Sequence, residues 1–95
     1  MKENNIDVAA RCVKALSHPT RLKILATLRE GEKSVQEIER VVGTTQSNIS
    51  QHLSVLRDKD ILSYRKEGNQ VFYMIANRKV IQLLELMQEI FCPGM

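Results

Sequence analysis

Proline is scarce in this sequence, and long apolar runs are absent. The 95 residues include only two prolines, and 43% of them are hydrophobic and 26% charged, which is typical of a folded domain rather than of a disordered chain. No apolar run approaches the roughly 20 residues that cross a bilayer, and no long apolar stretch follows the first positive charge, as it would in a secretory signal. We therefore expect a cytoplasmic protein with no membrane association.

Patterns of catalytic and metal-binding residues are also absent. The sequence has no convincing nucleophile with its base, no catalytic carboxylate pair and no phosphate-binding glycine loop, so we expect neither an enzyme nor a cofactor. His18 and His52 are expected on different elements, and two histidines fall short of the four ligands of a zinc site, so no metal site is predicted. Cys12 and Cys92 lie near opposite ends of the chain, without Cys-x-x-Cys spacing, and are expected to be thiols.

The length of the chain allows one domain, residues 1–95, with a small core. A domain of this size buries only about 60–65% of the surface that its unfolded chain exposes, and a partner subunit is a natural supplement to such a core. The net charge of +3 is a mild indication of a polyanionic partner.

Apolar spacing and capping residues predict five helices. Apolar side chains recur at intervals of three and four residues in each of them. Ser17 or His18 is expected to cap the second helix, the run Ser34-Val35-Gln36-Glu37 matches a capping box, and Gly43 is expected to end the third helix because glycine adopts positive φ angles. The predicted helices cover residues 5–16, 19–29, 34–41, 45–57 and 77–91.

Two strands are predicted between the fourth and fifth helices. Residues 61–66 and 70–75 contain Ile, Val, Tyr and Phe, which favour strands. The run Glu67-Gly68-Asn69 joins them, and its Gly and Asn tolerate the positive φ angles of a tight hairpin turn. The predicted fold is α+β, mainly α: a winged helix-turn-helix with a two-stranded wing and dimerisation helices at both ends.

The third and fourth helices form the predicted DNA-binding unit. In a helix-turn-helix the second helix enters the major groove of DNA. Here that helix carries amide and hydroxyl groups that bond base edges, whereas a merely solvated face usually carries Lys and Glu. The predicted base-reading residues are Thr45, Gln46, Ser47, Asn48, Ser50 and Gln51, with Ser54 on the same face. Arg57, Lys59, Arg65 and Lys66 follow, and are expected at phosphates, which position a protein without specifying sequence.

The last helix is apolar around more of its circumference than one subunit's core requires. Val80, Leu83, Leu86 and Ile90 lie on different sides of it. Since a monomer rarely exposes a large contiguous apolar patch, we expect a two-fold dimer formed by the first and last helices. Two recognition helices then lie about 34 Å apart, and the operator in double-stranded DNA is expected to be an inverted repeat.

Two runs of the sequence resemble the ArsR/SmtB-type winged-helix repressors: ALSHPTRLKIL at residues 15–25 and QSNISQHLSVLR at residues 46–57. The resemblance covers nearly the whole chain. It implies a homodimer that leaves its operator when a metal ion, a metalloid or an oxidant is sensed. One metal site of the family uses a Cys-x-Cys pair where this chain has Ser34 and Gln36, and another uses His and acidic ligands where it has Glu85 and Glu89 but no His.

The cysteines leave three interpretations open. They are a thiol switch, closed by a disulfide or by a sulfur chain formed from persulfides; part of a soft metal or metalloid site; or inert packing residues. Cys92 directly follows the last helix, as does a cysteine in family members that sense reactive sulfur or oxidants. In those relatives the first cysteine is at the position of Ala26, whereas here it is Cys12. A winged helix used as a protein-interaction module is the alternative function.

Overall fold

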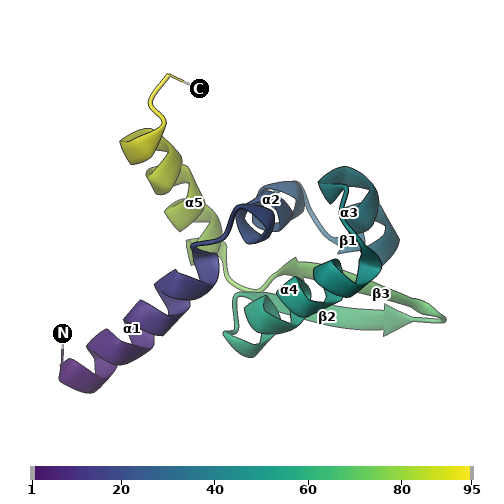
Figure 1. Ribbon diagram of the computed structural model, residues 1–95, viewed down its shortest axis with the longest axis horizontal. Helices are drawn as coiled ribbons and strands as arrows, with labels where there is room; N and C mark the ends of the chain where they lie inside the picture. Colours follow the sequence, from purple (N-terminus) through teal and green to yellow (C-terminus); the bar gives the residue numbers. More distant parts are fainter. Residues whose placement is uncertain (1, 95) are drawn as a thin grey trace.

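The computed structural model describes residues 2–94, which fold into five helices and three strands (Figure 1). The elements are α1 (Glu3–Leu16), α2 (Pro19–Leu28), β1 (Lys33–Ser34), α3 (Val35–Val42), α4 (Gln46–Asp58), β2 (Leu62–Glu67), β3 (Gln70–Ile75) and α5 (Arg78–Phe91). The predicted mainly helical winged fold is confirmed. Each predicted helix is present, and no end differs from the prediction by more than two residues.

The wing is a three-stranded antiparallel sheet rather than the predicted two-stranded hairpin. Its strand order is β1-β3-β2, and the hairpin register pairs Glu67 with Gln70 around Gly68, which has a φ of 61°. The prediction missed β1 because two residues are too short to show an alternating pattern. This strand is defined by its pairing with β3, in which Lys33 lies opposite Tyr73.

Side-chain caps fix where α2, α3, α4 and α5 begin, whereas α1 has no such cap. His18, rather than Ser17, caps α2, and its Nδ1 accepts the backbone N–H two residues ahead (3.1 Å). The predicted capping box of α3 is present, with Ser34 and Glu37 each accepting the other's backbone N–H (3.1 and 3.0 Å). Asn77 caps α5 in a similar way (2.8 Å). The capped starts hold each helix in a fixed register against the core.

The core lies between the sheet and the helices α2, α3 and α4 (Figure 1). Its largest fully buried side chains are Ile24, Leu25, Ile38, Ile49, Leu53, Leu56 and Leu62. The end of α1 adds Ala15 and Leu16, whereas α5 contributes no fully buried residue. The helix-turn-helix is therefore the rigid centre of the domain.

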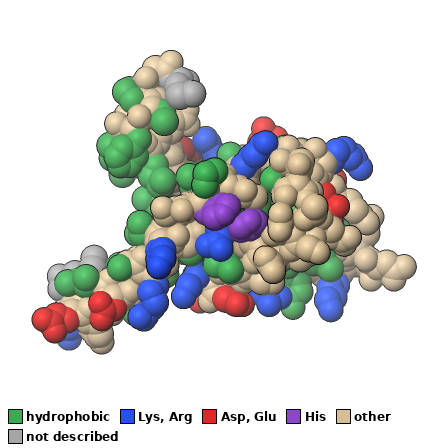
Figure 2. All heavy atoms as spheres, viewed as in Figure 1, with side chains coloured by type: hydrophobic (Ala, Val, Ile, Leu, Met, Phe, Trp, Pro, Cys, Tyr) green, Lys and Arg blue, Asp and Glu red, His purple; other side chains and the backbone are tan. Residues whose placement is uncertain are grey.

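The two terminal helices extend from this centre as separate arms (Figure 1). Apolar side chains lie uncovered along both arms, as the green patches of Figure 2 show. They are Ile6, Val8 and Val13 on α1, and Leu83, Leu86, Ile90 and Phe91 on α5. In the part of the chain that the structure describes, no helix is long and apolar enough to cross a membrane.

Candidate nucleic-acid interface

The turn between α3 and α4 sets the orientation of the predicted recognition helix. Gly43 adopts the left-handed conformation (φ 77°), and its N–H donates to the carbonyl of Glu39 (2.8 Å). Thr45 then caps α4 by accepting the backbone N–H of Asn48 (3.3 Å), and the Asn48 side chain donates to the hydroxyl of Thr44 (3.1 Å). These local bonds hold the first turn of α4 at the molecular surface.

One face of α4 is buried, and the opposite face is polar and exposed. Ile49, Leu53 and Leu56 pack into the core, which turns the remaining side chains of the first two turns outward. The exposed residues are Thr45, Gln46, Ser47, Asn48, Ser50 and Gln51. This uncharged row consists of hydrogen-bonding groups that suit the edges of bases.

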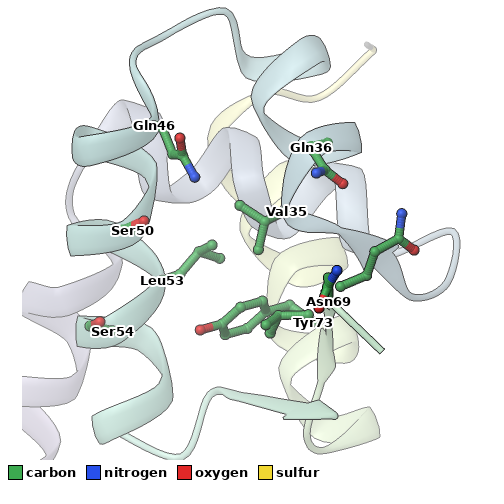
Figure 3. A pocket seen from close by; sticks show the side chains of 10 residues that line it. Val35, Gln36, Gln46, Ser50, Leu53, Ser54, Asn69 and Tyr73 are labelled. Atoms are coloured by element: carbon green, nitrogen blue, oxygen red, sulfur yellow. The ribbon is translucent and has the colours of Figure 1, made fainter. Parts of the chain in front are cut away.

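A groove of about 290 Å³ separates α4 from the wing (Figure 3). Val35 and Leu53 form its apolar floor, and Tyr73 points across it toward Ser54. Its lining includes Gln46 and Ser50 from the polar row, and none of its lining residues is charged. The groove therefore runs along the polar row of α4, which is the predicted base-reading face.

Sequence reasoning missed two side chains of this groove, Gln36 and Tyr73. Gln36 belongs to the first turn of α3, and Tyr73 lies on β3. The pairing of β1 with β3 brings the start of α3 against the wing and places both residues in the groove. The only sequence signal for this pairing is the short run before the capping box, which forms β1. Its partner residue on β3 is 40 positions further along the chain, since Lys33 pairs with Tyr73.

The predicted phosphate-binding cations differ in how their charges are partnered. Arg65 makes a two-pronged bond to Glu32 (2.6 and 3.1 Å) and a further bond to Glu67 (2.7 Å). These bonds raise the pKa of Arg65 and lower the pKa of Glu32. Arg57 pairs with the neighbouring carboxylate of Asp58 (3.7 Å) and lies 5.2 Å from the centre of the Tyr64 ring. Lys66 is exposed and takes part in none of the ion pairs of residues 2–94.

The structure places the predicted sensor thiols on the two arms. Cys12 is half-buried on α1, Cys92 is exposed directly after α5, and both are free thiols. Cys92 lines a hollow between α2 and α5 that Ala26 also lines. Ala26 is the position at which the resemblance places the first cysteine of thiol-sensing relatives. No disulfide joins Cys12 to Cys92 within the subunit.

The two histidines lie together although they belong to different elements. The ring centres of His18 and His52 are 4.5 Å apart. Among residues 2–94, no group of three or more His, Cys, Asp and Glu residues is arranged to hold a metal ion. No local pattern in the sequence indicates this contact, because the rings meet only through the packing of α2 on α4.

Comparison with known proteins identifies the family to which this interface belongs. The model of the arsR family of bacterial regulatory proteins matches residues 18–64. The biofilm growth-associated repressor of Xylella fastidiosa is 41% identical over 90 residues, which are 95% of this chain and 79% of the repressor. The chain belongs to the ArsR family.

Two further ArsR-type relatives extend the match to the whole fold. The transcriptional activator HlyU of Vibrio cholerae is 36% identical over 97% of this chain and 85% of HlyU. A solved structure of reduced HlyU superposes with a TM-score of 0.84 and 36% identity, covering 95% of each chain. A homodimeric winged helix-turn-helix DNA-binding domain from Mycobacterium bovis gives a TM-score of 0.88 at 30% identity, covering 100% of this chain and 91% of that one.

These findings confirm the predicted family and winged fold. As an ArsR-family member, the chain is a DNA-binding transcriptional regulator and not an enzyme. The match to residues 18–64 spans the helix-turn-helix and the first part of β2, which is the region that presents the polar row of α4.

Proposed function

We propose that this ArsR-family chain is a homodimeric repressor that binds an inverted-repeat operator in double-stranded DNA. The observation that carries the proposal is the exposed, uncharged row on α4, which begins at the Thr45 cap and lies beside the wing. Gln and Asn bond an adenine edge with two hydrogen bonds, and Ser either donates or accepts. The repressor of Xylella fastidiosa and the homodimeric domain of Mycobacterium bovis support this assignment.

A second copy of the chain accounts for the uncovered apolar faces of α1 and α5. In a two-fold dimer each subunit offers the same patch, and such an interface places two recognition helices about 34 Å apart on one side of the duplex. Lys66 then contacts a phosphate, and Arg57 and Arg65 join it by exchanging carboxylate partners for phosphates. Because the proposed partner is duplex DNA, the proposed activity is a cytoplasmic one.

Selection of duplexes from a random pool tests the proposed function. We expect the enriched sequences to share an inverted repeat whose half-sites are centred about 10 base pairs apart. The logarithm of the affinity should fall linearly with the logarithm of salt concentration, because phosphate contacts release counterions. A protein-interaction module would enrich no sequence, and that result would overturn the proposal.

We further propose that modification of Cys12 and Cys92 releases the operator. One thiol lies on each arm of the proposed dimer interface, and neither is in a disulfide. When peroxide joins two thiols, it accepts two electrons and two protons and becomes water. When a small persulfide transfers its outer sulfur to each protein thiol, its own thiol leaves, and the two protein persulfides formed in this way join as a trisulfide and release hydrogen sulfide. A bond between the arms of two subunits would change the spacing of the recognition helices, a coupling typically of about 1–3 kcal/mol.

Mass spectrometry paired with operator binding tests the thiol switch. The protein is exposed in turn to peroxide, a persulfide and arsenite, and its affinity for the selected duplex is measured after each. We expect peroxide and persulfide to release the duplex from the native chain but not from Cys12→Ser. A response to arsenite alone would indicate a metalloid sensor, and an unchanged peroxide response in Cys12→Ser would remove this cysteine from the mechanism.

A further inference from the structure

A cluster of three side chains lies where α1, α2 and α4 meet. The rings of His18 at the start of α2 and His52 in the middle of α4 are in contact, with their planes tilted by 54°. Arg21 of α2 lies against His52. The cluster is on the face of the molecule shown in Figure 2, where the two histidines lie beside basic side chains. It lies outside the polar row of α4 and outside the groove between α4 and the wing.

Arg21 connects the recognition helix to the end of the α1 arm. Its Nε donates to Nδ1 of His52 (3.0 Å), and its Nη1 donates to the carbonyl of Ala15 (3.2 Å). Ala15 belongs to the last turn of α1 and is buried. One planar guanidinium therefore spans two elements, one that reads DNA and one that carries part of the uncovered apolar face.

The hydrogen bonds of the cluster determine which nitrogen carries the proton in each neutral ring. Nδ1 of His52 accepts from Arg21, and Nδ1 of His18 accepts the backbone N–H of Thr20 (3.1 Å). A ring nitrogen that accepts a hydrogen bond carries no proton, so each neutral ring bears its proton on Nε2. The connection between Arg21 and His52 consequently exists only while His52 is neutral.

We propose that Arg21 is a positioning residue that holds the recognition helix at a fixed orientation to the α1 arm, and that protonation of His52 breaks this link and weakens operator binding. The inference rests on the proposed function, since it assigns a means of regulation to the same DNA-binding dimer. A proton on Nδ1 of His52 would face the Nε–H of Arg21, so two donors and two positive charges would meet. α4 would then be free to rotate away from the α1 arm.

The charges around the cluster favour the neutral form of His52. Burial, followed by electrostatic interactions with His18 and Arg21, holds the pKa of His52 below its ordinary value of 6.5. The charged groups that line the adjoining hollow are all cationic: Arg11 and Lys14 from α1, Arg21 from α2 and Lys59 from the end of α4. On the β2 side of α4, Arg57 packs on Tyr64. The link is thus intact at neutral pH and lost as the medium becomes acidic.

The direction in which DNA affinity changes with pH distinguishes this inference from a simple effect of added charge. An added positive charge on a DNA-binding face normally tightens binding, because it neutralises one more phosphate. The proposed loss of the fixed orientation of α4 has the opposite effect, because it weakens DNA binding at low pH. The chain contains only two histidines. Two single substitutions therefore show which histidine causes a change in affinity within the pH range in which histidine titrates.

The test measures affinity against pH at constant ionic strength, with the duplex that the native chain selects from a random pool at about pH 8. We expect the native chain to bind about tenfold more weakly at about pH 5.5. His52→Asn keeps an amide oxygen near the position of Nδ1 but does not titrate, so its affinity should match that of the native chain at high pH and stay flat. His18→Asn, the matched control, keeps an N-cap acceptor and should retain the response.

Arg21→Lys tests the link without changing the net charge. A lysine ammonium lacks the fork that reaches both acceptors, so we expect affinity about tenfold lower at high pH and no further loss on acidification. Circular dichroism at each pH reports whether the variant is folded; if it is not, the two histidine variants decide alone. Tighter binding at low pH, or a His52→Asn variant with the native pH response, would overturn the inference. Failure of the proposed function would instead leave no selected duplex to measure.

Discussion

Neighbouring cations on the wing differ in how their charges are partnered. Arg65 shares its charge with Glu32 and Glu67 and packs its guanidinium 4.5 Å from the centre of the Phe72 ring. Lys66, the next residue on β2, points to the other face of the sheet and has no ion-pair partner among residues 2–94. Glu32 therefore neutralises the charge of Arg65, which the sequence alone does not reveal.

Removing the charge of Glu32 is expected to strengthen binding to phosphates. In Glu32→Gln the two-pronged ion pair is lost, so Arg65 becomes available and the salt dependence of binding to a random duplex should steepen by up to about one unit of slope. Glu30→Gln is the control, because Glu30 is exposed, makes no ion pair among the described residues and changes the net charge equally. Fluorescence anisotropy against salt measures both slopes, and equal slopes would show that Arg65 does not face the DNA.

At the scale of elements, short local bonds decide where α3 and α4 begin and how they meet. The capping box joins Ser34 to Glu37 at the start of α3, and Ser34 is also the last residue of β1. The same residue therefore ends the strand that pairs with the wing and starts the first helix of the helix-turn-helix. We therefore expect a change in this cap to affect both the pairing of β1 with β3 and the start of α3.

Ser34→Ala is expected to lower the free energy of unfolding by roughly 0.5–2 kcal/mol, the usual cost of losing an N-cap hydroxyl. Ser17→Ala is the control, since Ser17 is exposed and its side chain makes no hydrogen bond in the described part of the chain; it should change stability by less than about 0.5 kcal/mol. Chemical denaturation measures both. Equal effects of the two substitutions would contradict the role of the cap.

Glu37 gives this cap a pH dependence. Its pKa is lowered because its carboxylate accepts the backbone N–H of Ser34 and interacts with the Ser34 hydroxyl. A lowered folded-state pKa means that the stabilisation is complete above the ordinary value of 4.5 and is lost as the pH falls below it. Glu37→Gln keeps an acceptor but does not titrate, so it should lose less stability than the native chain between neutral and acid pH. An identical acid profile would contradict this account.

The parts predicted from sequence are those that local signals determine. Capping residues such as Ser34 and Asn77, and the glycine at position 68, mark helix starts and the hairpin turn within a few residues of sequence. The contact of His52 with Arg21 and the pair of Arg65 with Glu32 span 31 and 33 residues. They follow from packing, which no local pattern encodes. The exposed side chains of α4 were predicted because the spacing of apolar residues along one helix is a local pattern. The groove beside them was not predicted, because it forms only when the wing packs next to α4.

At the scale of the whole molecule, the two arms carry an apolar surface that one subunit does not cover. Leu86 and Phe91 of α5 remain 51% and 74% exposed. They contribute little to the fold of the single chain, so changing them should act on association. The orientation of the arms relative to α4 then sets how two recognition helices are presented together.

Leu86→Glu is expected to dissociate the dimer without unfolding the subunit. Burying a leucine contributes about 1.5–3 kcal/mol, and two-fold symmetry changes two leucines at once, so the dissociation constant should rise by about 100-fold or more. Gln82→Glu, an exposed polar position on α5, adds the same charge and should leave association nearly unchanged. Analytical ultracentrifugation measures both, and a dimer of native strength in Leu86→Glu would place the interface elsewhere.

The most direct test of the account is the affinity of the Gln46→Ala, Ser50→Ala double variant for the selected duplex and for a random one. Since a good base contact contributes about 1–3 kcal/mol of discrimination, we predict at least about tenfold weaker binding to the selected duplex. Affinity for the random duplex should stay unchanged, because phosphate contacts are intact. Native affinity for the selected duplex in this variant would contradict the claim that α4 reads the operator.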